Sequence, residues 1–171
     1  MRKVKLFIAH SLDGYIARPN GSLDWLAADG DFGMTNFFKS IDTALMGRKT
    51  YEATLKLGGA PDAYKGMTYY VFSRSQESGA EGFEFISGDI RAFVESLREA
   101  KGKNIWLMGG GGLIESFLQE NLIDEFILTV FPIILGAGIP LFRGENQQTD
   151  LKLIESKSYE SGIVQLHYER K

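Results

Sequence analysis

The chain has 171 residues, of which 44% are hydrophobic and 24% are charged, and this composition predicts one globular domain over residues 1–171. With 19 basic and 22 acidic residues the formal net charge is −3, which gives no support to a nucleic-acid partner or an acidic membrane surface. The absence of cysteine excludes disulfides and thiolate metal sites, and two histidines are too few to predict a zinc site.

We expect neither a signal peptide nor a membrane span. The apolar run near the N-terminus reaches Asp13 too soon for a signal peptide. The longest uncharged stretch, residues 126–142, is interrupted by Pro132 and Pro140, so two buried strands joined by a turn explain it better than a membrane span. The expected location is therefore the cytoplasm.

The first predicted strand covers residues 5–9, and the segment His10-Ser11-Leu12-Asp13-Gly14 interrupts it before a second extended run at residues 15–17. Because ligands of open α/β sheets bind beyond the carboxyl ends of the strands, residues 13–16 are candidates for a site. A simple Asp-Gly turn is an equally good interpretation at this stage.

Residues 22–42 have an irregular pattern, in which a short helix over residues 35–40 is predicted. The segment carries four scattered aromatic side chains, Trp25, Phe32, Phe37 and Phe38. Such side chains usually belong to the core, although a flat heteroaromatic ligand would also contact them.

The next strand, residues 43–46, ends in Gly47-Arg48-Lys49-Thr50, where a helix over residues 50–55 is predicted to begin. Backbone N–H groups, the helix dipole and a guanidinium together suit a phosphate, whereas two solvated cations are the alternative. The strand at residues 67–72 is followed by Ser73-Arg74-Ser75. Hydroxyls and an arginine after a parallel strand suit a ribose 2′-phosphate, which favours NADPH over NADH.

A short strand at residues 84–87 precedes a helix that Asp89 or Ser87 caps and that runs to residue 101. Its apolar residues recur at helical spacing on one face. Residues 105–108 are then apolar without alternation, as a strand buried on both faces requires, and four glycines and a helix follow them. Glycine backbone at a helix start suits a phosphate, although a tight turn without a ligand is the alternative. The G-x-G-x-x-G pattern fails because Ile114 takes the place of its third glycine.

The remaining residues predict strands only. Residues 123–132 form an apolar strand in which Thr129 is a lone hydroxyl that bonds to backbone or faces a ligand. Residues 151–159 and 163–169 predict an antiparallel hairpin at a sheet edge, with His167 on its solvent face. The whole pattern predicts a three-layer α/β domain with a mostly parallel sheet and an antiparallel edge.

Five segments, in this order, resemble the dihydrofolate reductase superfamily: residues 11–17, 46–52, 72–74, 108–112 and 132–142. The chain is most similar to the branch that contains the reductase domain of bifunctional riboflavin-biosynthesis proteins and its stand-alone bacterial relatives. This resemblance implies a dihydrofolate reductase-like fold, with a central sheet of about eight strands, and an NADPH extended across the strand ends.

The resemblance also implies which residues bind the cofactor. Ala9 and Ile16 are expected near the nicotinamide, and Ser73 and Arg74 near the adenosine 2′-phosphate. The pyrophosphate and 2′-phosphate side is assigned to Gly47, Arg48, Lys49 and Thr50. The glycine segment is expected to wrap the pyrophosphate, with a strained or cis Gly109–Gly110 peptide; it comprises Met108, Gly109, Gly110, Gly111, Gly112 and Leu113.

On the substrate side, dihydrofolate reductases carry one buried acid after the first strand, and Asp31 stands near that place. A helix-capping or solvated aspartate is the alternative. Asp13, Trp25 and Thr129 are expected neighbours of the substrate.

The expected function is NADPH-dependent hydride transfer to a small heterocyclic or ribosylamino-pyrimidine substrate, as in 5-amino-6-(5-phosphoribosylamino)uracil reductase of riboflavin biosynthesis. The accompanying deaminase is excluded, because its P-C-x-x-C motif needs cysteine. The alternatives are a dihydrofolate reductase and a catalytically inactive NADPH-binding module. The apolar segment at residues 126–142 also leads us to expect a homodimer.

Overall fold

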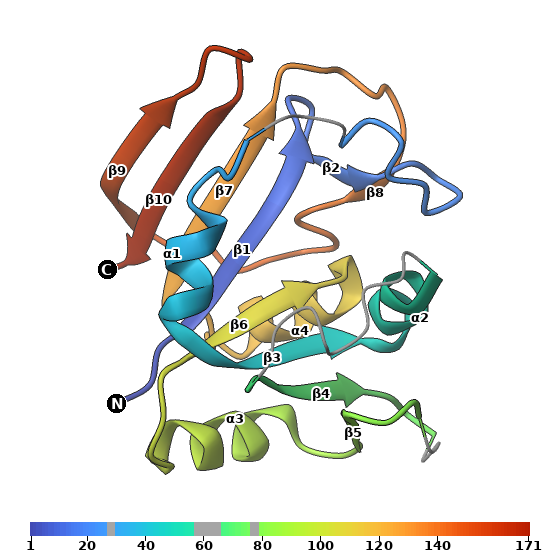
Figure 1. The fold of residues 1–171 in the computed structure, drawn as a ribbon, viewed down its shortest axis with the longest axis vertical. Coiled ribbons are helices and arrows are strands. Elements are labelled where there is room, and N and C mark those ends of the chain that lie inside the picture. Colours follow the sequence, from blue (N-terminus) through green and yellow to red (C-terminus); the bar gives the residue numbers. More distant parts are fainter. Residues whose placement is uncertain (27–29, 57–65, 76–78) are drawn as a thin grey trace.

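The computed structural model describes residues 1–26, 30–56, 66–75 and 79–171 (Figure 1). The first half of the described chain contains β1 (Val4–Ser11), β2 (Tyr15–Ala17), α1 (Met34–Lys39), β3 (Ile41–Gly47), α2 (Arg48–Lys56), β4 (Thr68–Phe72) and β5 (Phe83–Ile86). The second half contains α3 (Ile90–Glu99), β6 (Asn104–Gly109), α4 (Gly111–Gln119), β7 (Glu125–Phe131), β8 (Ile139–Pro140), β9 (Leu151–Ser158) and β10 (Val164–Arg170).

The main sheet has eight strands in the order β5-β4-β3-β6-β1-β7-β10-β9. The first six are parallel to one another, and β10 and β9 are antiparallel to their neighbours. Strands β2 and β8 form a separate antiparallel pair. The predicted mostly parallel sheet with an antiparallel edge hairpin is therefore confirmed.

Alternate residues of the central strands face opposite layers of helices. Leu6, Leu45 and Leu107 belong to one hydrophobic cluster together with residues of α3 and α4. Their chain neighbours Phe7, Met46 and Trp106 belong to a second cluster, together with Phe37 of α1 and Tyr51 of α2. Figure 1 shows α1 in front of the sheet and α4 behind it. The strands are thus buried on both faces, as their continuous apolar runs predict.

Two local predictions need correction. The solvent position predicted for His167 is wrong, because β10 is the second strand from the edge and β7 brings Glu125 beside it. The distance between Nε2 of His167 and Oε2 of Glu125 is 3.1 Å, and the histidine side chain is 23% exposed. The second buried strand predicted within residues 126–142 is only the two-residue, partly exposed β8.

The described helices are short, between six and ten residues. None of them is long and apolar enough to cross a membrane.

Candidate functional site

The carboxyl ends of β4, β3, β6 and β1 lie next to one another, because these four parallel strands are adjacent in the sheet. The three segments predicted to bind phosphate follow the ends of β3, β4 and β6. A Cβ added at Gly47 would lie 3.8 Å from the amide nitrogen of Gly110 and 3.9 Å from the carbonyl oxygen of Gly109. The end of β3 is therefore packed directly on the glycine segment.

Arg48 is brought close to the serines that follow β4. Its Nη1 donates to Oγ of Ser75 at 3.4 Å, and Oγ of Ser75 lies 3.4 Å from Oγ of Ser73. Nε of Arg48 also pairs with Oε1 of Glu52 at 3.0 Å, one turn along α2. A guanidinium and two hydroxyls thus meet at one exposed point, which is the donor set that a phosphate monoester requires.

Lys49 and Arg74 are both exposed beside this group. Neither of them forms an ion pair with another described residue. Ser75 was not among the residues assigned to the cofactor, although the sequence placed it next to Arg74.

The Gly109–Gly110 peptide bond is cis, as the resemblance implied. Gly110 is the N-cap residue of α4 and has no side chain to cap the helix. A Cβ added at Gly110 would lie only 3.1 Å from Oγ1 of Thr50. Helix α4 therefore begins with bare backbone, and a hydroxyl from α2 lies beside it.

Arg143, which the sequence analysis did not single out, lies against the first turn of α4. A Cβ at Gly111 would be 2.8 Å from Cδ of Arg143, and a Cβ at Gly112 would be 3.6 Å from its Nη1. The first amides of a helix lack intrahelical partners, so the added guanidinium makes this end more attractive to an anion. The only sequence signal for Arg143 is its position directly after the Pro140-Leu141-Phe142 segment.

The residues present fit the phosphates of a dinucleotide cofactor. Gly112 is exposed and Gly110 partly exposed, whereas Gly111 is buried against Arg143, and Thr50 lies beside Gly110. Arg48 and the two serines close to it, Ser73 and Ser75, lie beyond the end of β3, the strand next to β6. One end of the sheet thus offers two separate groups of anion-binding donors.

Asp13 joins two loops. Its Oδ1 accepts hydrogen bonds from Oγ of Ser11 at 2.6 Å and from the amide of Leu135 at 3.1 Å, and its Oδ2 accepts from the amide of Gly136 at 2.8 Å. The bond from Ser11 lowers the pKa of the Asp13 carboxyl. This carboxylate therefore ties the turn after β1 to the loop after β7.

The buried position expected for Asp31 is wrong, because its side chain is exposed. Its Oδ1 accepts from the amide and from Oγ1 of Thr35, at 2.9 and 2.6 Å, and these bonds lower the pKa of the carboxyl. Asp31 thus caps the first turn of α1, which is the alternative that the sequence left open.

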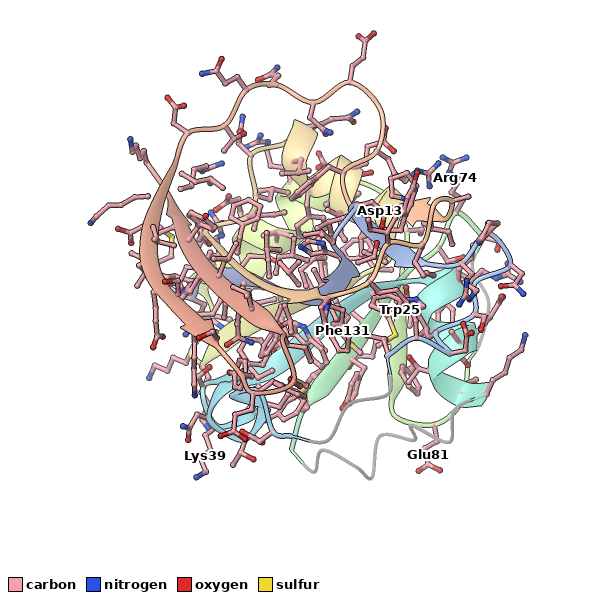
Figure 2. All side chains as sticks on the ribbon, turned by 90° about the horizontal axis from the view of Figure 1, so that it is seen from above. Asp13, Trp25, Lys39, Arg74, Glu81 and Phe131 are labelled. Atoms are coloured by element: carbon pink, nitrogen blue, oxygen red, sulfur yellow. The ribbon has the colours of Figure 1, made fainter. Side chains whose placement is uncertain are left out.

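Trp25 and Thr129 both lie near Ala9 of β1. Trp25, which Figure 2 shows close to Phe131, packs edge-on against it with ring centroids 5.3 Å apart. Ala9 packs against the same hydrophobic cluster. Thr129 is the register partner of Ala9, and its Oγ1 accepts a hydrogen bond from Nε2 of Gln165 at 3.0 Å. Ile16 instead packs against the cluster formed with α3 and α4.

No group of three or more metal-ligating side chains occurs among the residues that the structure describes. The donors assembled at the strand ends are amides, hydroxyls and guanidinium groups, which suit an anion.

The sequence matches the model of the RibD C-terminal domain over residues 2–165. It is 44% identical to the uncharacterized protein YwjB of Bacillus subtilis (strain 168), over 99% of this chain and 98% of that protein. Among solved structures, a Shewanella sp. PV-4 protein provisionally named a riboflavin biosynthesis protein shares 33% identity and a TM-score of 0.88, with 99% of each chain covered.

A bifunctional diaminohydroxyphosphoribosylaminopyrimidine deaminase and 5-amino-6-(5-phosphoribosylamino)uracil reductase of Thermotoga maritima shares the fold, with a TM-score of 0.75 at 17% identity. The chain aligns over 99% of its own length but spans 57% of that protein.

Proposed function

Because the chain belongs to the RibD C-terminal domain family, we propose that it is an NADPH-dependent reductase that transfers hydride to a small heterocyclic or ribosylamino-pyrimidine substrate. The observation that carries the proposal is the meeting of Arg48 with Ser73 and Ser75, one strand away from the bare glycine backbone at the start of α4. These two groups suit a 2′-phosphate and a pyrophosphate, respectively.

In this proposal the chain binds and orients the cofactor, which supplies the hydride when bound. Arg48 and the two serines hold the 2′-phosphate, and Lys49 and Arg74 add positive charge near it. The glycine backbone, Thr50 and Arg143 hold the pyrophosphate. Ala9 and Ile16 border the nicotinamide, and Met108 and Leu113 flank the glycine segment on either side in the sequence.

The activity named for the Thermotoga maritima protein provides the closest substrate class. In such a reduction C1 of the ribose would receive the hydride while its bond to the ring oxygen breaks, and that oxygen would take a proton from water, which opens the sugar to a ribityl chain. The protein then mainly has to hold the two reactants in line, and no strongly acidic side chain is required at the ring. Trp25 and Thr129 are the proposed substrate neighbours, and Asp13 supports them by fixing the adjoining loops.

A dihydrofolate reductase is less well supported. That reaction calls for a buried acid beside the substrate ring, and the residue expected to supply it, Asp31, is exposed and bonded to Thr35.

The experiment is an activity assay with the purified protein, NADPH and 5-amino-6-(5-phosphoribosylamino)uracil. We expect loss of the reduced-nicotinamide absorbance and a product heavier by two hydrogens, with no loss when the acceptor is omitted. NADPH that binds but is never oxidised, with this acceptor or with dihydrofolate, would instead favour the inactive binding module.

We also propose a homodimer, on the basis of exposed apolar side chains and not of the buried strand β7. The apolar side chains of β7 are used within the chain, between β1 and β10. Exposed apolar side chains remain at Leu12, Ile134 and Phe142. Light scattering that shows a monomer at micromolar concentration would contradict the dimer.

A further inference from the structure

The two tryptophans of the chain are equally buried but differ in their hydrogen bonds. Trp25 and Trp106 are each 8% exposed. Nε1 of Trp106 donates to the carbonyl of Phe7 at 3.1 Å. Nε1 of Trp25 has no hydrogen-bond partner in the described part of the chain. Trp25 therefore carries a buried donor from which no described residue accepts a hydrogen bond.

A second unused polar atom lies in the same cluster. Oη of Tyr159 is also buried without a partner among the described residues. Its ring packs edge-on against Phe32, with centroids 4.9 Å apart, and against the cluster formed by Trp25, Phe131 and Ile163. Tyr159 reaches this position from the connection between β9 and β10, where its amide donates to the carbonyl of Ile163 at 2.9 Å.

The amide group of Gln165 shows that hydrogen bonding is otherwise well satisfied here. Its Nε2 donates to the carbonyl of Phe32 and to Oγ1 of Thr129, both at 3.0 Å. Buried donors without partners are rare in native proteins, since they lose their bonds to water and gain none in return. Two of them in one aromatic cluster favour a partner from outside the described residues, such as a bound ligand.

The cluster lies at the reacting end of the proposed site. Ala9, which is expected beside the nicotinamide, contacts it, and Phe131 is the register partner of Ser11 at the end of β1. A hydride acceptor positioned beside Ala9 would therefore lie against the cluster to which Trp25 and Tyr159 belong. Aromatic rings favour a flat partner, and two donors favour one with acceptor atoms on its edge.

We propose that Nε1 of Trp25 and Oη of Tyr159 donate hydrogen bonds to the hydride acceptor, which is a planar ring with carbonyl oxygens or ring nitrogens facing this cluster. The inference rests on the proposed function and adds two substrate-binding side chains to it. Tyr159 gives the C-terminal hairpin a direct role in substrate recognition. Aliphatic carbonyl compounds without such a ring are poor substrates.

The test compares Trp25→Phe and Tyr159→Phe with the wild-type protein. The probes are 5-amino-6-(5-phosphoribosylamino)uracil and dihydrofolate, each titrated in the presence of NADP⁺. Each variant should bind the recognised ring about 5- to 100-fold more weakly than the wild type does. The reason is that the acceptor atom of the ligand stays desolvated but loses its hydrogen bond. NADPH affinity should not change, because neither side chain lies at the phosphate donors.

Unfolding of the ligand-free protein gives a readout that needs no substrate. Tyr159→Phe removes a hydroxyl without a partner, so the thermal midpoint should stay the same or rise. The matched control is Tyr51→Phe, since Oη of Tyr51 accepts a hydrogen bond from the amide of Ala80 at 2.9 Å. This control should lower the midpoint.

Three results would overturn the inference. The first is that both variants and the wild type bind the uracil compound and dihydrofolate equally well, and the second is a lower thermal midpoint for Tyr159→Phe than for Tyr51→Phe. The third is that the wild type binds NADPH but neither of the two ring compounds. Failure of the wild type to bind NADPH would instead overturn the proposed function.

Discussion

Nη1 of Arg48 donates to Oγ of Ser75 at 3.4 Å, although the two residues are 27 positions apart in the sequence. The contact exists because β3 and β4 are parallel neighbours, so that the segments following them emerge side by side. It combines a cation from the start of α2 with hydroxyls from the end of β4.

Arg48→Ala should therefore weaken NADPH binding selectively. A charged hydrogen bond to phosphate is worth about 1.5–3 kcal/mol, and this loss should appear for NADPH but hardly for NADH. Calorimetric titration with each nucleotide measures the difference.

Arg91→Ala is the matched control for this change. Nε of Arg91 pairs with Oε2 of Glu120 at 2.9 Å, with an exposure close to that of the Arg48–Glu52 pair. It lies on α3, away from the strand ends of the site, so its removal should leave nucleotide affinity unchanged. An equal loss in both variants would contradict a specific role for Arg48.

Arg143→Ala should weaken both nucleotides alike. The side chain lies over Gly111 and Gly112 at the start of α4, where the pyrophosphate common to NADPH and NADH is proposed to bind. We expect a loss of about 1.5 kcal/mol or more for each nucleotide. A loss of affinity confined to NADPH would instead indicate that Arg143 binds the 2′-phosphate.

Gly111→Ala should destabilise the protein, whereas Gly112→Ala should not. A Cβ at Gly111 would lie 2.8 Å from Cδ of Arg143 and 3.1 Å from the carbonyl oxygen of Pro140, while at Gly112 the nearest atom is 3.6 Å away. Overpacking costs about 1–3 kcal/mol, and alanine in place of an unstrained helical glycine gains about 0.5–1 kcal/mol. Urea unfolding at neutral pH compares the two variants, and equal stabilities would contradict the close packing at Gly111.

Stability should fall in acid through Glu125. Burial alone would raise the pKa of this carboxyl, but hydrogen bonds from Lys3 and Lys5 outweigh burial and lower it from 4.5 to about 2. A lowered folded-state pKa means that the stabilisation is complete above about pH 5 and is lost as the pH falls toward 2. The full effect corresponds to about 3 kcal/mol.

Urea unfolding at a series of pH values measures this dependence. Glu125→Gln should be less stable than the wild type at neutral pH and should lose less stability on acidification. Parallel pH profiles for the two proteins would show that Glu125 does not control the dependence.

The parallel strands and the gathering of the candidate phosphate-binding segments at one end of the sheet were predictable because their signals are local. Uninterrupted apolar runs identify strands that are buried on both faces, and the glycine segment and the Arg48 segment each follow such a run directly. The rule that ligands lie beyond the carboxyl ends of parallel strands then brings the segments together. The cis Gly109–Gly110 peptide followed from the resemblance and not from the residues alone.

The errors and omissions concern residues that are positioned by tertiary contacts. Asp31 was placed by counting along a segment without periodicity, and its own bond to Thr35 turns it toward α1. Arg143 and Tyr159, which we propose as site residues, lie in connections that pack over distant elements, α4 and the end of β1. His167 was misplaced because alternation within a hairpin does not reveal which of its strands forms the edge.

The measurement that tests the central claim most directly is a calorimetric titration of the purified wild-type protein with NADPH and, separately, with NADH. We expect both nucleotides to bind and NADPH to bind clearly more tightly, because Arg48, Ser73 and Ser75 are proposed to act only on the 2′-phosphate. Binding of neither nucleotide, or equal binding of the two, would contradict it.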